Sequence, residues 1–213
     1  MIHFNGHLLA AIDIETTGFI PGHNDIVQIC ILILTSEIKP DLEVNPFYMT
    51  IKPKRPENVE KEAMSVSRLN YAQILQTAVD PWDAADLFDD WFVSLRHDTP
   101  KRRAKLPENK KLLPLAQNWV FDRPFIMDWL GSKSFDDFFH PWYRDTLAVA
   151  QYLNDSYAMN PNCVLPHKIP FPKSNLGYLC AQLKIHNEKA HDALQDCIVT
   201  AEVYRRMALK QVP

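Results

Sequence analysis

Two acids at the end of an apolar run are the first residues whose types and spacing could do chemistry. Asp13 and Glu15 follow apolar residues in the stretch LLAAIDIETTG at 8–18. On a β-strand, residues two apart point to the same side, with Cα atoms roughly 6–7 Å apart. Hard cations such as Mg²⁺ prefer carboxylate oxygens. The pattern therefore indicates a divalent-cation site, and the alternative is a half-buried strand that merely ends in acids.

A histidine and an aspartate form a second candidate group. The sequence HDALQDCIVTAEVYRRM opens a predicted helix that runs from about His191 to Leu209, and Asp196 follows the histidine by five residues. At about 3.6 residues per turn, the two side chains would lie roughly 140° apart on a regular helix. They can converge if His191 lies just before the regular helix, because the first residues of a helix are only partly committed to helical geometry. We interpret Asp192 as a first-turn acid favoured by the helix dipole.

Strands must position these acids. Runs of β-branched and alternating residues at 26–34 and 46–53 predict two strands after the acidic one. The short connections suggest an antiparallel meander that begins with the acidic strand and places its carboxylates at a sheet edge. Residues 112–130 predict a short strand and then a helix that begins near Phe121, so that Asn118 and Asp122 lie where strand gives way to helix.

Helical spacing of apolar residues predicts further helices. They cover 57–76 (one or two short helices), 81–96, 143–153 and 174–185. Pro81 suits a first helical turn, and Ser174 is a candidate cap. The segment 160–172 is a proline-rich loop. The segment 97–111 is polar and basic, and it predicts a surface loop that either contacts a phosphate backbone or is only a solvated face.

Length and composition limit the class of protein. The chain has 213 residues and a formal net charge of −3, which predicts a single domain over 1–213 with 97–111 as a basic surface loop insertion. This charge excludes nucleic-acid binding by bulk positive charge, but it allows a local basic surface around an acidic metal site. The cysteines form no CxxC pair, and no secretory signal or membrane-length apolar run is visible, so we expect reduced thiols and a cytoplasmic protein.

The motifs together resemble a known superfamily. DIETTG at 13–18, QNWVFDRPFI at 117–126 and HDALQD at 191–196 occur in the order found in the Asp-Glu-Asp-Asp 3′→5′ exonucleases with a catalytic histidine, the DEDDh type. Ribonuclease T and the polymerase III epsilon proofreading subunit belong to this superfamily. The resemblance covers most of the chain and implies an α/β fold of the ribonuclease-H-like type, in which helices flank a mixed five-stranded sheet.

The resemblance also implies roles for five residues. Asp13, Glu15, Asp122 and Asp196 would bind two Mg²⁺ or Mn²⁺ ions, with Asp13 bridging both and Asp122 acting largely through bound water. His191 would be the general base that takes a proton from the attacking water. A serine or cysteine nucleophile finds no support in the motifs.

The expected substrate is the 3′ end of a nucleic acid. We expect release of nucleoside 5′-monophosphates from single-stranded DNA or frayed ends, in proofreading or repair, with a polymerase or another replication or repair protein as a candidate partner. An RNA-trimming exoribonuclease is the alternative, because contacts to the 2′-OH cannot be read from the sequence. A catalytically inactive nucleic-acid-binding module is a third reading. The residues expected to hold the substrate are Thr16, Thr17, Gly18, Phe19, Asn118 and Phe121.

Overall fold

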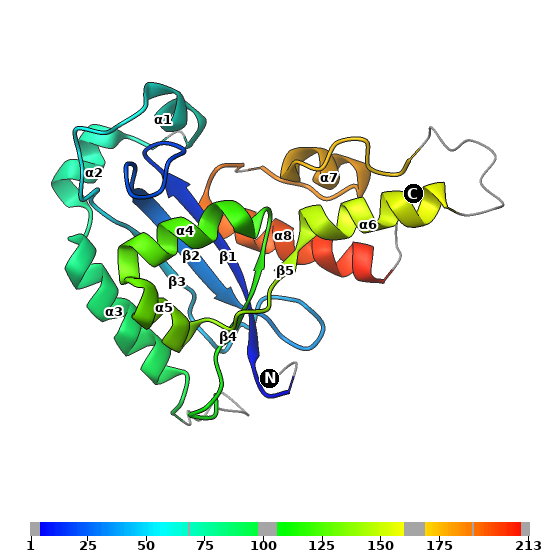
Figure 1. Cartoon of the computed structure of the whole chain (residues 1–213), viewed down its shortest axis with the longest axis horizontal. Coiled ribbons are helices and arrows are strands. Elements are labelled where there is room, and N and C mark those ends of the chain that lie inside the picture. The colour runs from blue at the N-terminus through cyan, green and yellow to red at the C-terminus, as the bar shows by residue number, and fades with distance from the viewer. Residues whose placement is uncertain (1–4, 68, 98–105, 160–168, 189, 210–213) are drawn as a thin grey trace.

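The sheet has five strands in the order β3-β2-β1-β4-β5 (Figure 1). The structure is a computed structural model that describes residues 5–67, 69–97, 106–159, 169–188 and 190–209. β1 pairs antiparallel with β2 and parallel with β4, so the sheet is mixed. The strands are β1 (Leu8–Thr16), β2 (Ile26–Ile33), β3 (Phe47–Thr50), β4 (Leu112–Ala116) and β5 (Arg144–Asp145).

Helices cover both faces of the sheet (Figure 1). Residues of β1 alternate between two hydrophobic clusters, since Leu8 and Ala10 join one cluster and Leu9 and Ala11 the other. This burial on both faces explains why the strand reads as a continuous apolar run. The helices are α1 (Lys61–Ser67), α2 (Tyr71–Thr77), α3 (Pro81–Ser94), α4 (Trp119–Leu130), α5 (Ser132–Phe138), α6 (Thr146–Ala158), α7 (Leu176–Gln182) and α8 (Ala193–Ala208).

The two layers of helices differ in composition. The first cluster joins the sheet to α3, α4 and α5, and its centre is an aromatic group in which Phe88 contacts Phe47 and Trp129. The second cluster joins the sheet to α8, and a third packs α8 against α6 and α7. The α8 face is the one that matters for the site, because β1 directs Leu9, Ala11 and the residues at alternate positions after them toward it.

The structure confirms most of the predicted elements and corrects several. The meander over β1, β2 and β3 is confirmed, as is the mixed five-stranded sheet. The predicted sheet edge is wrong, because β1 is the central strand; its acids lie instead past the last paired residues of β1 and β4, Ala11 and Leu115. The sequence patterns missed β5, which has two residues, and α5. Asn175 rather than Ser174 caps α7 by accepting a hydrogen bond from Tyr178 N–H.

Part of the predicted basic loop is anchored in the core. Residues 98–105 of the 97–111 segment lie outside the described residues. Leu106 is buried in the first cluster, and its N–H donates to the Leu95 carbonyl at 2.8 Å. Leu106 therefore anchors this segment, whereas Glu108 and Asn109 are exposed, as in a surface loop. In the described residues, no helix is both long and apolar enough to cross a membrane.

Candidate active site

The acidic end of β1 points toward α8. Asp13 and Glu15 lie at alternate positions after Leu9 and Ala11, so their side chains leave the same face of the sheet. Both acids are paired through the backbone with β2, whereas the ladder with β4 ends at Ala11. The two carboxylates therefore have sheet on one side and space for another element on the other.

Asp122 occupies the position that β4 leaves open. It lies in the first turn of α4 and is buried, with 3% of its surface exposed. Its carboxylate accepts a hydrogen bond from the backbone N–H of Ile14, which lies between the two acids of β1. Asp145 fixes the start of α4, because its two oxygens accept hydrogen bonds from the N–H groups of Asn118 and Trp119 at 3.0 and 2.8 Å. The β4–α4 turn thus delivers Asp122 to Asp13.

The start of α8 brings the histidine and the last aspartate together. His191 lies just before the helix with φ +68°, in the left-handed region that non-glycine residues rarely adopt. This conformation lets its N–H donate to Asp196 Oδ2 at 2.9 Å, and Asn187 Nδ2 donates to Asp196 Oδ1 at 3.2 Å. His191 therefore lies outside the regular helix and close to Asp196, as the sequence predicted. Asp192 is not a first-turn acid but the N-cap, whose side chain accepts from Gln195 N–H.

These elements concentrate negative charge at one point. Ligand atoms of Glu15, His191 and Asp196 all lie within 4.8 Å of one another. Burial raises the pKa of the Asp13 carboxyl well above its ordinary value, and the charges of Asp122, Asp196 and Glu15 raise it further. Burial and the charges of Asp196 and Asp192 raise the pKa of Glu15 to about 7.

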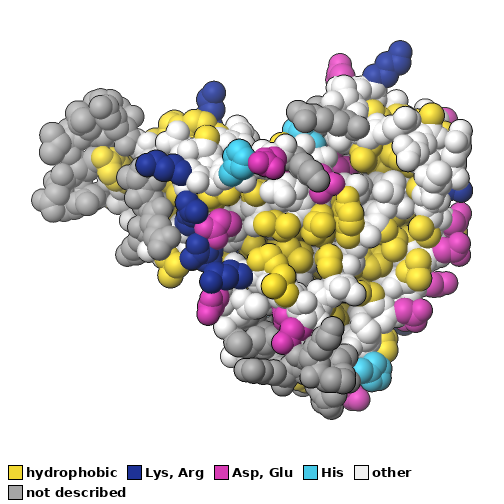
Figure 2. Space-filling model, turned by 180° about the vertical axis from the view of Figure 1, so that it is seen from behind, with side chains coloured by type: hydrophobic (Ala, Val, Ile, Leu, Met, Phe, Trp, Pro, Cys, Tyr) yellow, Lys and Arg dark blue, Asp and Glu magenta, His cyan; other side chains and the backbone are white. Residues whose placement is uncertain are grey.

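The same pattern holds for the other two acids. Burial, followed by the charges of Asp145 and Glu15, raises the pKa of Asp122 well above its ordinary value. Burial also raises the pKa of Asp196, against the opposing effect of the His191 and Asn187 hydrogen bonds. The carboxylates repel one another, and a divalent cation would offset that repulsion. Figure 2 shows that acidic and histidine side chains gather where the surface is hollowed between the main body and the arm that carries α6 and α7.

The shifted carboxyls predict a pH-dependent stabilisation by metal. A carboxyl whose pKa is higher in the folded state binds more protons when folded, so the free energy of unfolding of the metal-free protein falls as pH rises. For Glu15 this loss begins near its ordinary value of 4.5 and is complete above about 7. Mn²⁺ should therefore raise Tm more at about pH 8 than at about pH 5, as thermal melts would measure.

A salt control separates this effect from screening. Potassium chloride at matched ionic strength should give a smaller rise in Tm than Mn²⁺ at the higher pH. An equal rise with Mn²⁺ at both pH values would contradict a carboxylate metal site.

A hydrogen-bonded bridge from the sheet fixes the start of α8. Gln28, on β2 opposite Glu15, accepts a hydrogen bond from Ala193 N–H at 3.0 Å and donates to the Tyr48 hydroxyl at 3.2 Å. The Tyr48 hydroxyl donates in turn to Asp192 Oδ2 at 2.9 Å. The residue after His191 is thereby tied to two strands. This bridge sets the distance between β1 and the histidine.

Removing one bond of this bridge should reduce turnover. Tyr48→Phe deletes the hydroxyl that donates to Asp192, so we expect a loss of about 1 kcal/mol in the free energy of unfolding. We also expect kcat to fall by about tenfold with little change in KM, because His191 is displaced from the reacting atoms. Chemical denaturation and steady-state kinetics would measure the two effects.

Tyr71→Phe is the matched control for that variant. It also deletes a hydroxyl that donates one hydrogen bond, here to the Pro56 carbonyl at 3.0 Å. The cost in stability should be similar, and kcat should not change. Full kcat in Tyr48→Phe would show that the bridge does not position His191.

The residues after β1 are fixed by their own hydrogen bonds. Thr16 Oγ1 donates to the Gly18 carbonyl at 2.6 Å, and buried Thr17 accepts from Asp25 N–H at 2.9 Å. A Cβ at Gly18 would overlap the side chains of Asn24 and Glu60, which gives this glycine a packing reason in addition to the one expected from a turn. The threonine hydroxyls therefore shape the loop, and Thr17 is also fixed by its backbone, which donates to the Asp25 carbonyl and accepts from Glu60 N–H.

Of the predicted substrate residues, those outside this loop differ in exposure. Phe19 is 57% exposed, whereas Phe121 is half-buried against the first cluster and lies 5.1 Å from the Phe125 ring. Asn118 is exposed, has φ +70°, and makes no cap hydrogen bond with its side chain. Phe19 and Asn118 are therefore accessible to a ligand, and Phe121 is largely a core residue.

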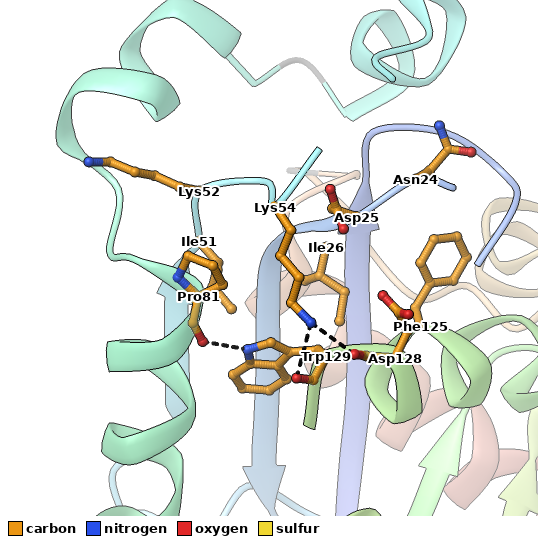
Figure 3. Close-up of a pocket in the computed structure, with 10 residues that line it drawn as sticks. All are labelled: Asn24, Asp25, Ile26, Ile51, Lys52, Lys54, Pro81, Phe125, Asp128 and Trp129. Atoms are coloured by element: carbon orange, nitrogen blue, oxygen red, sulfur yellow. Dashed lines mark hydrogen bonds between the residues drawn. The ribbon is translucent and has the colours of Figure 1, made fainter. Parts of the chain in front are cut away.

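An ion-pair junction joins the loop after β1 to α4. The Arg55 guanidinium contacts both Asp25 and Asp128. Lys54 Nζ donates to the carbonyl oxygens of Asp128 and Trp129 (Figure 3). The cavity at this junction measures about 10 Å³, which is too small for a ligand larger than one water molecule. The junction therefore fixes the position of the loop after β1 relative to α4.

Comparison with known proteins agrees with this geometry. Residues 10–101 match the family model named Exonuclease, RNase_T. Ribonuclease T of Wigglesworthia glossinidia brevipalpis is 24% identical over 204 residues, which cover 94% of this chain and 84% of the relative. Ribonuclease T of Shewanella oneidensis is 25% identical over 209 residues, which cover 94% and 82%. These similarities support the resemblance to the DEDDh-type 3′→5′ exonucleases.

Solved structures show that this chain shares its fold with larger nucleases. The zinc-bound form of the E. coli exonuclease I complex with single-stranded DNA superposes with a TM-score of 0.69 at 18% identity, over 96% of this chain. The chain spans only 41% of that protein. Cell-death related nuclease 4 superposes with a TM-score of 0.65 at 18% identity, over 96% of this chain and 64% of its own. At these identities the likeness establishes the fold.

Several residues of the exonuclease site were missed by sequence reasoning. Asp145, Gln28 and Tyr48 hold the turn before α4 and the start of α8. Two signals were available in the sequence. Gln28 is a polar residue inside the apolar run IVQICILIL, where a buried amide requires a partner. Asp145 directly precedes a helical pattern, as an N-cap does, and its side chain accepts from Leu147 N–H.

Proposed function

We propose that this chain hydrolyses nucleic acids from the 3′ end and releases nucleoside 5′-monophosphates. The observation that carries the proposal is the convergence of Glu15, His191 and Asp196 within 4.8 Å, near enough to Asp13 and Asp122 for the charges of these acids to raise one another's pKa values. Four acids from three distant parts of the chain have a reason to meet only where cations offset their repulsion. The inactive-module reading is disfavoured because all five residues are present.

The donor set fits a hard divalent cation. The four carboxylates offer only oxygen atoms, and burial together with neighbouring acids raises their pKa values. We propose that Asp13, Glu15, Asp122 and Asp196 bind two Mg²⁺ or Mn²⁺ ions. When bound, a metal pair lowers the pKa of water and stabilises charge on the phosphate oxygens.

His191 is the proposed general base. It is exposed, and its backbone bond to Asp196 holds it beside the carboxylates. A ring nitrogen of His191 would accept a proton as the water oxygen forms a bond to phosphorus. The bond from phosphorus to the 3′ oxygen then breaks, which leaves a 3′-hydroxyl on the strand and a 5′-phosphate on the released nucleotide. Thr16, Thr17 and Gly18 would bind the terminal nucleotide through their backbone, and Phe19 and Asn118 would contact it with their side chains. Phe121 would support the site indirectly, because it packs against the first hydrophobic cluster.

Single-stranded DNA is the first candidate substrate, with frayed ends included. Support comes from exonuclease I, whose solved structures contain single-stranded DNA and a dT13 oligonucleotide. RNA is the second candidate, and the sequence relatives named ribonuclease T favour it. A role in proofreading or repair, with a polymerase or another replication protein as partner, remains part of the DNA proposal.

Two oligonucleotides of the same sequence, one DNA and one RNA, test the proposal. Each is incubated with Mg²⁺ or Mn²⁺, and kcat/KM and the released nucleotide are measured. We expect nucleoside 5′-monophosphates from both strands and a higher kcat/KM for DNA. A higher value for RNA would favour the second candidate, and release of 3′-monophosphates would contradict the proposed bond cleavage.

A further inference from the structure

A second cavity lies at the opposite end of β1 from the acids. It has a volume of about 370 Å³, within the range of small-ligand sites. His7 precedes β1, and Leu113 pairs with Leu9 near the start of that strand, whereas Asp13 and Glu15 lie toward its other end (Figure 1). The cavity is thus distinct from the proposed metal site. Its lining consists of Asn5, His7, Lys110, Leu113, His140, Trp142 and Arg144.

This cavity is lined by hydrogen-bond donors and by positive charge. The lining includes the basic side chains of Lys110 and Arg144, and none of the described residues that line the cavity is acidic. The Nδ1 atom of His7 accepts from Lys111 N–H at 3.1 Å, and the Nδ1 atom of His140 accepts from Trp142 N–H at 3.1 Å. Each neutral imidazole therefore carries its proton on Nε2 and adds another donor.

The rings of His7 and His140 are in contact at this cavity. Their ring centroids lie 4.3 Å apart. Burial lowers the pKa of His7, and the charges of His140 and Lys110 lower it further. An anion in the cavity would find basic side chains and hydrogen-bond donors among the lining residues.

Trp142 adds an aromatic surface beside these donors. The side chain is 69% exposed, although its indole contacts the edge of His140 at 5.4 Å between centroids. Bases stack on exposed aromatic surfaces in single-strand binders. The basic side chains could bind the phosphate of a nucleotide, and the indole could stack on its base.

We propose that this cavity binds a nucleotide unit, with its phosphate on Lys110 and Arg144 and its base against Trp142. The proposal rests on the proposed function, because that function brings nucleotides to the protein. The unit is either part of the substrate strand away from its 3′ end or a released mononucleotide. The apolar Leu113 lies at the cavity as a contact for the sugar or base.

Binding measurements with the double variant Lys110→Gln/Trp142→Ala test the proposal. Labelled oligothymidylates of increasing length and thymidine 5′-monophosphate are titrated at low ionic strength with chelator, which prevents hydrolysis. We expect about tenfold weaker binding by the variant, the size expected for one lost stack and one lost phosphate contact. A loss that appears only with longer strands identifies the strand as the ligand, and a loss with the monophosphate identifies the free nucleotide. Trp142→Phe alone should retain most of the affinity.

The control is the double variant Lys133→Gln/Trp82→Ala. Lys133 is exposed and Trp82 is 70% exposed, and neither lines the cavity. Equal affinities of the two double variants, or no detectable binding of either ligand by the wild-type protein, would overturn the proposal. Nucleotide release from a short strand with Mg²⁺ is measured in parallel. If the wild-type protein releases nucleotides but the cavity binds none, only the proposal for the cavity is wrong. If no nucleotide is released, the proposed function is wrong.

Discussion

Replacement of Asp13 by asparagine should lower the rate of nucleotide release by about 10³-fold or more, since the loss of a metal-binding carboxylate removes several kcal/mol of transition-state stabilisation. Asparagine keeps the shape of the side chain but loses its charge. Asp13 is close enough to Asp122, Asp196 and Glu15 for their charges to raise its pKa. Binding of Mn²⁺, measured by calorimetry, should be lost together with activity.

The same substitution should stabilise the protein in the absence of metal. The charged form of Asp13 is disfavoured by burial and by its acidic neighbours, so a neutral side chain removes that repulsion. Tm with chelator at about pH 8 should therefore rise in Asp13→Asn.

Asp80→Asn is the control for this variant. Asp80 caps α3 by accepting from Trp82 N–H, and asparagine caps helices about equally well. Activity, Mn²⁺ binding and Tm should all stay at wild-type values. An Asp13→Asn protein that retained activity and bound Mn²⁺ would contradict the proposed site.

Replacement of His191 by asparagine should lower kcat by about 10²- to 10⁴-fold, the usual contribution of a general base. Asparagine is the appropriate choice because it tolerates the left-handed backbone at φ +68° and retains the N–H that donates to Asp196. Folding should therefore be preserved. Mn²⁺ affinity should be unchanged, because the carboxylates remain.

This variant separates two roles for the histidine. Its ring lies close enough to Glu15 and Asp196 to act as a metal ligand instead of a base. If Mn²⁺ affinity falls along with kcat, His191 is a ligand and the assignment as base is wrong. His186→Asn serves as control, since the His186 side chain is 84% exposed and pairs with Glu188.

The sequence predicted best the features that depend on local residue types and spacing. The apolar run before Asp13 and Glu15 predicted β1, because a strand buried on both faces has to be apolar throughout. The meeting of His191 with Asp196 followed from helix geometry once the histidine lay outside the helix. The approach of Asp122 to them could not be derived from spacing, and only the family resemblance implied it.

Other features depend on long-range packing that no local pattern carries. β5 has two residues and is defined only by its pairing with β4, so it leaves no periodicity in the sequence. The bridge from Gln28 through Tyr48 to Asp192 joins residues more than a hundred positions apart. The central place of β1 results from β4 adding beside it, which the meander alone did not reveal.

Incubation of a 5′-labelled single-stranded oligonucleotide with the protein and Mg²⁺ or Mn²⁺, resolved by length over time, tests the central claim most directly. We predict a ladder of labelled products that shortens one nucleotide at a time from the 3′ end, and that chelator abolishes. An intact strand with both metals, internal cleavage, or shortening that persists in chelator would contradict the metal-dependent 3′→5′ exonuclease proposed for this site.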